Sequence, residues 1–134
     1  PDAAILLSIS DRLKAEALPL IHKLHRAGYA FFATEGTSAM LTALGMPVTM
    51  VTKVLSGAHP NVVDVINEGT VQCVINLPEG RFTGSLRDGF HIRRAAAEKR
   101  IPCFTSIDTA RAAIDALANA ADYEIATLAE YVGA

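Results

Sequence analysis

The sequence predicts a three-layer α/β domain, in which helices cover both faces of a five-stranded parallel sheet. Short runs that are apolar throughout recur along the chain, and such runs are typical of strands covered on both faces. Segments of helical periodicity alternate with these runs, and the short connections favour right-handed crossovers within one open sheet. The chain has 134 residues, the length of one domain, so we assign residues 1–134 to a single unit.

The first half of the chain holds three predicted strands and two predicted helices. Apolar runs place the strands at 3–8, 29–33 and 48–54. The first helix begins near Ala15, after a turn at 11–14, and ends at Gly28, because glycine suits the left-handed conformation after a helix. Pro19 favours this late start, since proline is tolerated only in a first helical turn. The second helix covers residues 37–44.

The second half holds two more predicted strands and three more predicted helices. The strands are the apolar segments 71–75 and 101–104. The helices are predicted at 60–69, 88–99 and 108–120. Pro60 can open the first of these, and Asp108 with Thr109 can cap the last. Residues 76–87 contain a proline and two glycines and are predicted to form a loop, whereas the pattern of 123–134 does not distinguish helix from loop.

Composition and charge exclude several classes of protein. Hydrophobic residues make up 51% of the chain and charged residues 19%, which is typical of a folded domain. The net charge of -2 offers no basic excess, so we expect neither a nucleic-acid partner nor a membrane surface. Without a membrane-spanning run or a basic signal segment, we expect a soluble, cytoplasmic protein. The start at Pro1, without an initiator methionine, favours a fragment of a longer chain.

Metal, disulfide and catalytic signatures are absent from the sequence. Cys73 and Cys103 lie far apart in apolar stretches and are predicted to be buried thiols in a reducing compartment. His22 and His25 have a spacing that a metal could use, but no Cys or carboxylate ligand set accompanies them. The sequence contains no GxGxxG, GxxxxGK or Gly-x-Ser-x-Gly motif. We therefore predict no metal, no cofactor and no catalytic residue.

Polar side chains follow the ends of the predicted strands. In open parallel sheets ligands bind outside the carboxyl ends of the strands, so we expect these residues to share one edge. The turn from Thr34 to Thr37 leads directly into a helix, where free N–H groups favour an anion and Gly36 allows close approach. Lys14 and Lys53 can supply two cations for a phosphate or a carboxylate. The predicted anion site consists of Ser8, Lys14, Thr34, Gly36, Thr37, Lys53 and Asn76.

Each of these side chains also has a structural alternative. A Ser or Thr at the start of a helix can serve only as a cap, and Lys14 can be a solvated surface residue. His59 lies beside Pro60 after the third predicted strand, where it can line the site or only shape the turn. Arg93 and Arg94 lie on a helix with other charged residues, and we expect most of this charge to form a solvated face. The convergence of several polar residues on one edge is what favours a binding site.

Six elements of the sequence, taken in order, together resemble the methylglyoxal-synthase-like superfamily. They are Ser8 with Lys14, Ala33 to Thr37, Lys53 with Val54, Val74 to Asn76, Asp88 to Ala95, and Ile101 with Pro102 followed by Asp108 to Ala110. Over nearly its whole length the chain is most similar to the carboxy-terminal allosteric domain of the carbamoyl phosphate synthase large subunit. The resemblance implies a Rossmann-like α/β/α fold that binds an effector and transmits this binding to catalytic domains outside the chain.

The resemblance also implies ligands and partners. In bacterial relatives the effectors are nucleotides such as UMP and IMP, and the predicted anion site matches their contact positions except at Gly36. Candidates for the rim of the effector site are His59, Pro78, Asp88 and Arg94. Thr105 matches a position near ornithine, which in some relatives binds at the interface with the rest of the subunit. The effector therefore stays open among UMP, IMP, ornithine and another small phosphorylated or acidic metabolite.

In such relatives the whole enzyme is a ligase. It converts glutamine or ammonia, bicarbonate and ATP to carbamoyl phosphate for pyrimidine and arginine synthesis. The implied partners of this chain are the catalytic domains of the same large subunit, and a homo-oligomer is a further expectation. The fragment alone is expected to have no enzymatic activity.

One enzyme of the same superfamily supplies the alternative function. Methylglyoxal synthase removes phosphate from dihydroxyacetone phosphate with a carboxylate base. His59 stands where that enzyme has its catalytic aspartate, Ser85 stands near the position of its histidine, and Asp88 matches an aspartate of the enzyme. An acidic residue alone cannot complete the proton transfers. The alternative is therefore a lyase in which His59 and Asp88 act as acid and base.

Overall fold

The structure, a computed structural model, describes residues 3–53, 57–78 and 83–115, and only the main chain of 83–88. Within these residues the strands are β1 (Ala4–Ile9), β2 (Ala30–Ala33), β3 (Thr49–Met50), β4 (Cys73–Leu77) and β5 (Cys103–Phe104). The helices are the 3-10 helix η1 (Asp11–Leu13) and the α-helices α1 (Lys14–Arg26), α2 (Glu35–Ala43), α3 (Val62–Asn67) and α4 (Thr83–Glu98). A further helix begins at residue 107 and is described as far as residue 115.

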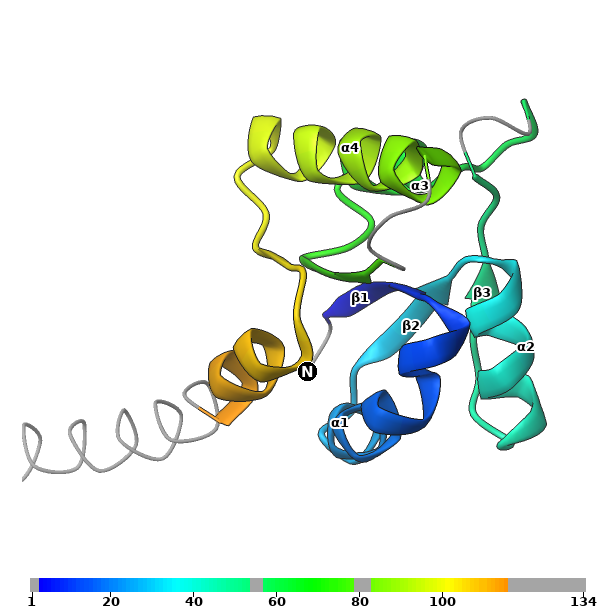
Figure 1. Ribbon diagram of the computed structural model, residues 1–134, viewed down its shortest axis with the longest axis vertical. Helices are drawn as coiled ribbons and strands as arrows, with labels where there is room; N and C mark the ends of the chain where they lie inside the picture. Colours follow the sequence, from blue (N-terminus) through cyan, green and yellow to red (C-terminus); the bar gives the residue numbers. More distant parts are fainter. Residues whose placement is uncertain (1–2, 54–56, 79–82, 116–134) are drawn as a thin grey trace, which may run out of the picture.

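The strands form one parallel sheet in the order β3-β2-β1-β4-β5, and Figure 1 labels β1, β2 and β3 of this sheet. β1 is central because the chain adds β2 and β3 on one side and then crosses over to add β4 and β5 on the other. Leu6 and Leu7 of β1 are therefore covered from both faces, and each is 0% exposed. This arrangement confirms the predicted α/β class with five parallel strands.

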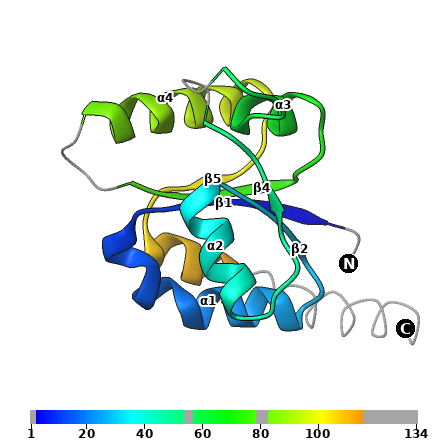
Figure 2. The same cartoon turned by 90° about the vertical axis from the view of Figure 1, so that its right-hand side faces the viewer.

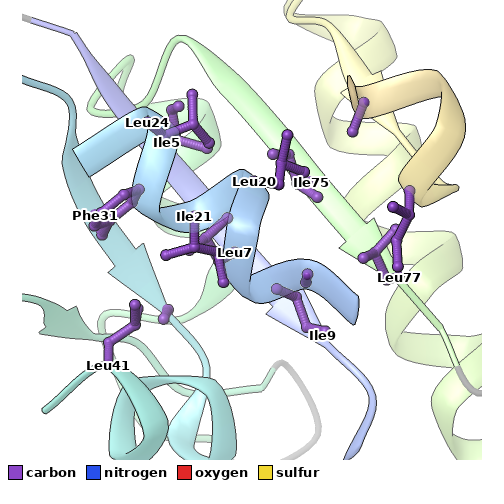
Figure 3. Packing of buried hydrophobic residues seen from close by; sticks show 14 of the residues in the cluster. Ile5, Leu7, Ile9, Leu20, Ile21, Leu24, Phe31, Leu41, Ile75 and Leu77 are labelled. Carbon is purple, nitrogen blue, oxygen red and sulfur yellow. The ribbon is translucent and has the colours of Figure 1, made fainter. Parts of the chain in front are cut away.

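Helices cover both faces of this sheet. α1, α2 and the helix from residue 107 lie on one face, and α3 and α4 lie on the other (Figure 2). In the first interface, Ile5 and Leu7 of β1 pack in one cluster with Ile21 and Leu24 of α1 (Figure 3). The second interface contains Leu6, Val62, Ile66, Val74 and Ile92. Because successive side chains of β1 point to opposite faces and both faces are covered, the strand is apolar from residue 4 to residue 7.

Two segments differ most from the prediction, and β4 covers Cys73–Leu77 instead of 71–75. α4 begins at Thr83, inside the segment 76–87 that we predicted to be a loop, because a helix packed through its later turns extends at little cost. β3 covers only Thr49–Met50 instead of 48–54. At Thr52 the segment that follows β3 no longer pairs with β2. The Thr52 hydroxyl donates to the carbonyl of Ala58 at 2.8 Å, and the Thr52 N–H donates to the carbonyl of Pro60 at 3.0 Å.

Two details of the helices also differ. α1 follows a turn, as expected, but Pro19 lies within the helix on its exposed side and not in the first turn. The last helix is capped by Ser106, whose hydroxyl oxygen accepts a hydrogen bond from the Thr109 N–H at 3.1 Å. The predicted cap, Asp108, is instead an exposed residue of the first turn.

The two cysteines lie on neighbouring strands, Cys73 on β4 and Cys103 on β5. They point to opposite faces of the sheet, since the residue that pairs with Cys103 is Val74. Both are free thiols, but they are half-buried and not the buried thiols that the sequence predicts. Burial, with a smaller contribution from Cys103, raises the pKa of Cys73 to about 11. Because the thiolate is the reactive form, this thiol is poorly reactive at neutral pH.

Candidate anion-binding site

A cavity of about 280 Å³ lies at the carboxyl ends of β1, β2 and β4. Its walls come from the segments that follow these strands, from the first turns of α1 and α2, and from α4. All seven residues of the predicted anion site line this cavity, together with Ser10, Asp11, Pro78 and Gly89. Their common location is the edge at which open parallel sheets bind ligands.

The cavity floor is a row of polar residues across three strands. On the face of the sheet covered by α4, the three strands first carry a row of apolar residues that packs into the core. This row consists of Leu6, Phe32 and Val74. Two residues further along each strand, the same face carries Ser8, Thr34 and Asn76. Ser8 pairs with Asn76, and the Thr34 N–H donates to the carbonyl of Leu7 at 3.2 Å, which holds the three strand ends in register. The core therefore ends, and the polar cavity begins, at one level of the sheet.

The N-terminus of α2 opens onto this row. Thr34 occupies the capping position, but its side chain makes no capping hydrogen bond. The alternative that this hydroxyl serves only as a helix cap therefore does not hold. The first helical hydrogen bond of α2 is donated by Ser38, to the carbonyl of Thr34 at 2.7 Å. The N–H groups before Ser38 have no acceptor within the helix, and the helix dipole adds positive potential at the same end. This geometry favours an anion.

Thr37 joins α2 to the end of β1. Its hydroxyl accepts a hydrogen bond from the Ile9 N–H at 3.1 Å and donates to the Ile9 carbonyl at 3.4 Å. The residue is 1% exposed, so both hydrogen bonds are buried. Thr37 therefore fixes the two elements whose ends form the cavity wall.

Two lysines and one carboxylate share the rim of the cavity. Lys14, the first residue of α1, forms an ion pair with Asp11, and Lys53 follows β3. The hydrogen bond from Lys14, its charge, and the charge of Lys53 hold the pKa of Asp11 below its ordinary value. Asp11 is thus a counter-ion that a bound anion must compete with. No sequence signal points to this role, because an exposed aspartate at the start of a helix is common.

Replacing Gly36 by alanine is expected to weaken phosphate binding without unfolding the chain. A Cβ at Gly36 would lie 3.2 Å from the Lys14 Nζ, so the ammonium group would have to move. We expect the dissociation constant for inorganic phosphate, measured by calorimetry, to rise about three- to tenfold, the scale of one weakened hydrogen bond. The melting temperature is expected to stay equal or to rise, because alanine favours a helix over glycine. Unchanged phosphate affinity would contradict this close approach.

α4 contributes a glycine and an arginine to the same region. A Cβ at Gly89 would lie 3.2 Å from Asn76 Nδ2 and 2.9 Å from Arg93 Nη1. The absence of a side chain at Gly89 therefore leaves room for the Asn76 amide, and the Arg93 guanidinium approaches the cavity wall. From the sequence we expect most of the charge of this helix to be solvated and Arg94 to be a candidate for the rim of the effector site. Arg94 does point outward, where its Nε donates to Glu98 at 3.1 Å, and it does not line the cavity.

His59 does not line this cavity and pairs with the start of α3. Its Nδ1 is 2.5 Å from Asp64 Oδ2, and its side chain is 70% exposed. Asp64 belongs to a capping box with Asn61, in which each side chain accepts from the other's N–H at 2.9 Å. Asn61, and not the predicted Pro60, therefore starts α3.

The Asp64 carboxylate is expected to make α3 sensitive to acid. The hydrogen bonds from His59 and from the Asn61 N–H lower the pKa of Asp64 below its ordinary value of 3.8. A lowered pKa in the folded state means that this stabilisation is present above 3.8 and is lost as the pH falls below it. The Asp64→Asn variant should unfold more easily than the unmodified chain at neutral pH, and the difference should shrink in acid. Urea denaturation at several pH values measures this, and a difference independent of pH would contradict it.

The other candidates named from the sequence differ in their position relative to the cavity. Pro78 lines the cavity directly after β4. Thr105 is exposed after β5 and does not line it. Asp88 lies in α4, where its side chain, like that of Ser85, falls outside the described part of the structure.

The described part of the chain offers neither a cluster of metal ligands nor a membrane-spanning helix. No group of three or more His, Cys, Asp or Glu among these residues could hold a metal ion. None of the described helices combines the length and the apolar character needed to cross a bilayer.

A family model and several known proteins match this chain. A family model described as the MGS-like domain matches residues 16–105. The carbamoyl phosphate synthase large chain of Thermomicrobium roseum is 47% identical over 115 residues, which cover 86% of this chain and 11% of the relative. That of Clostridium botulinum (strain Langeland) is 43% identical over 111 residues, or 83% of this chain and 10% of the relative.

A third relative carries only part of that protein. The C-terminal section of the carbamoyl phosphate synthase large chain from Methanopyrus kandleri is 39% identical over 117 residues, covering 87% of this chain and 21% of the relative. The chain thus spans about a tenth of the length of the first two relatives, at 11% and 10%. The family model covers most of the chain, and the described fold agrees with the resemblance found in the sequence. The chain belongs to the MGS-like domain family, in which it matches the C-terminal region of the carbamoyl phosphate synthase large chain.

Proposed function

We propose that this chain is a regulatory domain of a carbamoyl phosphate synthase large chain, and that it binds a small phosphorylated effector in the cavity at the end of the sheet. The observation that carries the proposal is the convergence of Lys14, Lys53 and the N-terminus of α2 on one polar cavity. Two cations and a set of free N–H groups are what a phosphate group requires. Nucleotides such as UMP and IMP are the first ligands to test.

The regulatory role depends on domains outside this chain. An effector shifts activity only when it binds two states of the larger molecule with different affinities, so the domain by itself binds but does not switch. The catalytic domains of the same large chain are the proposed partners, and the ligase reaction is assigned to them. This chain spans only 11% and 10% of the length of two of its relatives. Their remaining length supports placing the ligase reaction in other domains.

The lyase alternative has weaker support. It requires His59 as a proton-transfer group at the substrate, but the imidazole is hydrogen-bonded to Asp64 and does not line the cavity. General acid–base catalysis requires the group within hydrogen-bond reach of the reacting proton. Incubating the chain with dihydroxyacetone phosphate and assaying methylglyoxal tests this alternative. A turnover that is lost in the His59→Ala variant would favour the lyase over the regulatory domain.

Calorimetric titration tests the proposed ligand class. We expect UMP or IMP to bind the chain and uridine or inosine, which lack the phosphate, to bind at least about tenfold more weakly, since each charge-assisted contact is worth about 1.5–3 kcal/mol. The same titration of a full-length large chain, with the ligase activity as the second readout, tests regulation. Equal binding of nucleotide and nucleoside would contradict a phosphate site, and binding without any change in ligase activity would contradict the regulatory role.

A further inference from the structure

Two buried polar atoms in the described part of the chain have no hydrogen-bond partner. They are Ser10 Oγ and Asn76 Nδ2. Both residues line the cavity at the end of the sheet. Nearly all buried polar groups in folded proteins are paired, because leaving one unpaired costs free energy. Two unpaired atoms that share one cavity therefore indicate a partner that binds there.

Ser10 is held in place by its main chain, and its hydroxyl is left unused. The Ser10 N–H donates to the carbonyl of Leu77 at 2.8 Å, which fixes the residue beside the end of β4. Its carbonyl accepts from the Leu13 N–H at 3.0 Å, so the residue starts η1. A serine at this position usually caps the helix through its side chain, but Ser10 makes no such hydrogen bond. The hydroxyl serves neither the strand nor the helix.

Asn76 is unpaired for a related reason. It is 3% exposed, and its Nδ2 lies 3.2 Å from the point where a Cβ of Gly89 would be. The glycine therefore accommodates the amide at the cavity wall without supplying an acceptor. A buried amide nitrogen is a donor only, so its missing partner is an acceptor atom.

We propose that Ser10 is a ligand-binding residue of this cavity, where its hydroxyl donates a hydrogen bond to a phosphate oxygen beside a second hydrogen bond from Asn76 Nδ2. This inference rests on the proposed function, because it adds donors to the same site. Lys14 and the N-terminus of α2 approach the cavity from β1 and β2, whereas Asn76 approaches from β4. Donors on several sides suit the three terminal oxygens of a phosphate ester better than the two oxygens of a carboxylate.

The Ser10→Ala variant separates this role from a structural one. In the free chain, the variant removes an unpaired buried hydroxyl, so the urea midpoint is expected to stay the same or to rise. Calorimetry with inorganic phosphate is expected to show a dissociation constant about three- to tenfold higher than that of the unmodified chain. Thr37→Val is the matched control for stability, because the Thr37 hydroxyl is paired with Ile9 and its loss should lower the urea midpoint.

The outcomes distinguish this inference from the proposed function. If the unmodified chain binds phosphate and Ser10→Ala binds it equally well, the role of Ser10 is wrong while the phosphate site stands. A lower urea midpoint of free Ser10→Ala, similar to that of Thr37→Val, would show that the hydroxyl is structural and would also overturn the inference. If the unmodified chain binds no phosphate or nucleotide at all, both proposals fail.

Discussion

Replacing Lys14 and Lys53 together by methionine is expected to abolish measurable binding of inorganic phosphate and of nucleotides to this chain. Both residues line the cavity, and the charges of both lower the pKa of Asp11, with Lys53 the smaller contributor. Each single replacement should weaken binding by about 1–3 kcal/mol, the scale of a charge-assisted hydrogen bond. Methionine keeps most of the length of the side chain but removes the charge and the hydrogen-bond donors of the ammonium group. Calorimetry with phosphate and with UMP measures the effect.

The control for this experiment is Lys23→Met. Lys23 lies on α1, forms an ion pair with Asp115, and is half-exposed outside the cavity, so phosphate affinity should not change. Loss of the Lys14 partner should cost little stability, because the Asp11 side chain is 89% exposed and can be solvated. If the double variant bound phosphate like the Lys23→Met variant, the two lysines would not form the site. If it unfolded, the lysines would be structural.

Replacing Leu6 by alanine is expected to destabilise the fold by about 3–5 kcal/mol, the scale of a buried leucine truncated in a core that cannot collapse. Leu6 lies in the central strand β1, is 0% exposed, and packs in the interface with α3 and α4. Small domains have a total stability of about 5–15 kcal/mol, so this one change should remove a large part of it. Urea denaturation followed by circular dichroism measures the loss.

Leu44→Ala is the matched control for Leu6→Ala. Leu44 follows α2 and is 44% exposed, so its truncation should change the free energy of unfolding by no more than about 0.5 kcal/mol. Equal effects of the two substitutions would contradict the central position of β1. A Leu6→Ala chain that keeps its stability would contradict the interface between the sheet and α3 and α4.

Much of the fold follows from the pattern of apolar residues. The parts of β1 and β4 that lie in the core, residues 4–7 and 73–75, are apolar throughout because both faces of the central strands are covered. This feature is visible in a single sequence. β3 was predicted too long, since its apolar run continues past Met50, but the hydrogen bonds of Thr52 go to the segment around Pro60. The start of α4 was missed because Pro78 and the glycines after it are typical of a loop, whereas helix packing extends α4 to Thr83.

The site could be predicted from the ends of the strands, but only in part. Polar residues after buried strands share one edge of a parallel sheet, which is why Ser8, Thr34 and Asn76 line one cavity. Ser10 carries the same sequence signal, yet only the structure shows that its hydroxyl is buried and unpaired. The position of Arg93 beside Gly89 likewise depends on how α4 packs on the sheet, which local sequence does not specify.

Nuclear magnetic resonance of the isotope-labelled chain, titrated with inorganic phosphate, shows directly whether the carboxyl ends of the strands bind an anion. The amide signals of Ser10, Gly36 and Thr37 are expected to shift together and to saturate with a single dissociation constant. Signals from the opposite end of the sheet, around Gly28 and Tyr29, should stay in place. Shifts that never saturate, or that saturate only at the opposite end of the sheet, would contradict an anion receptor at the carboxyl ends of the strands.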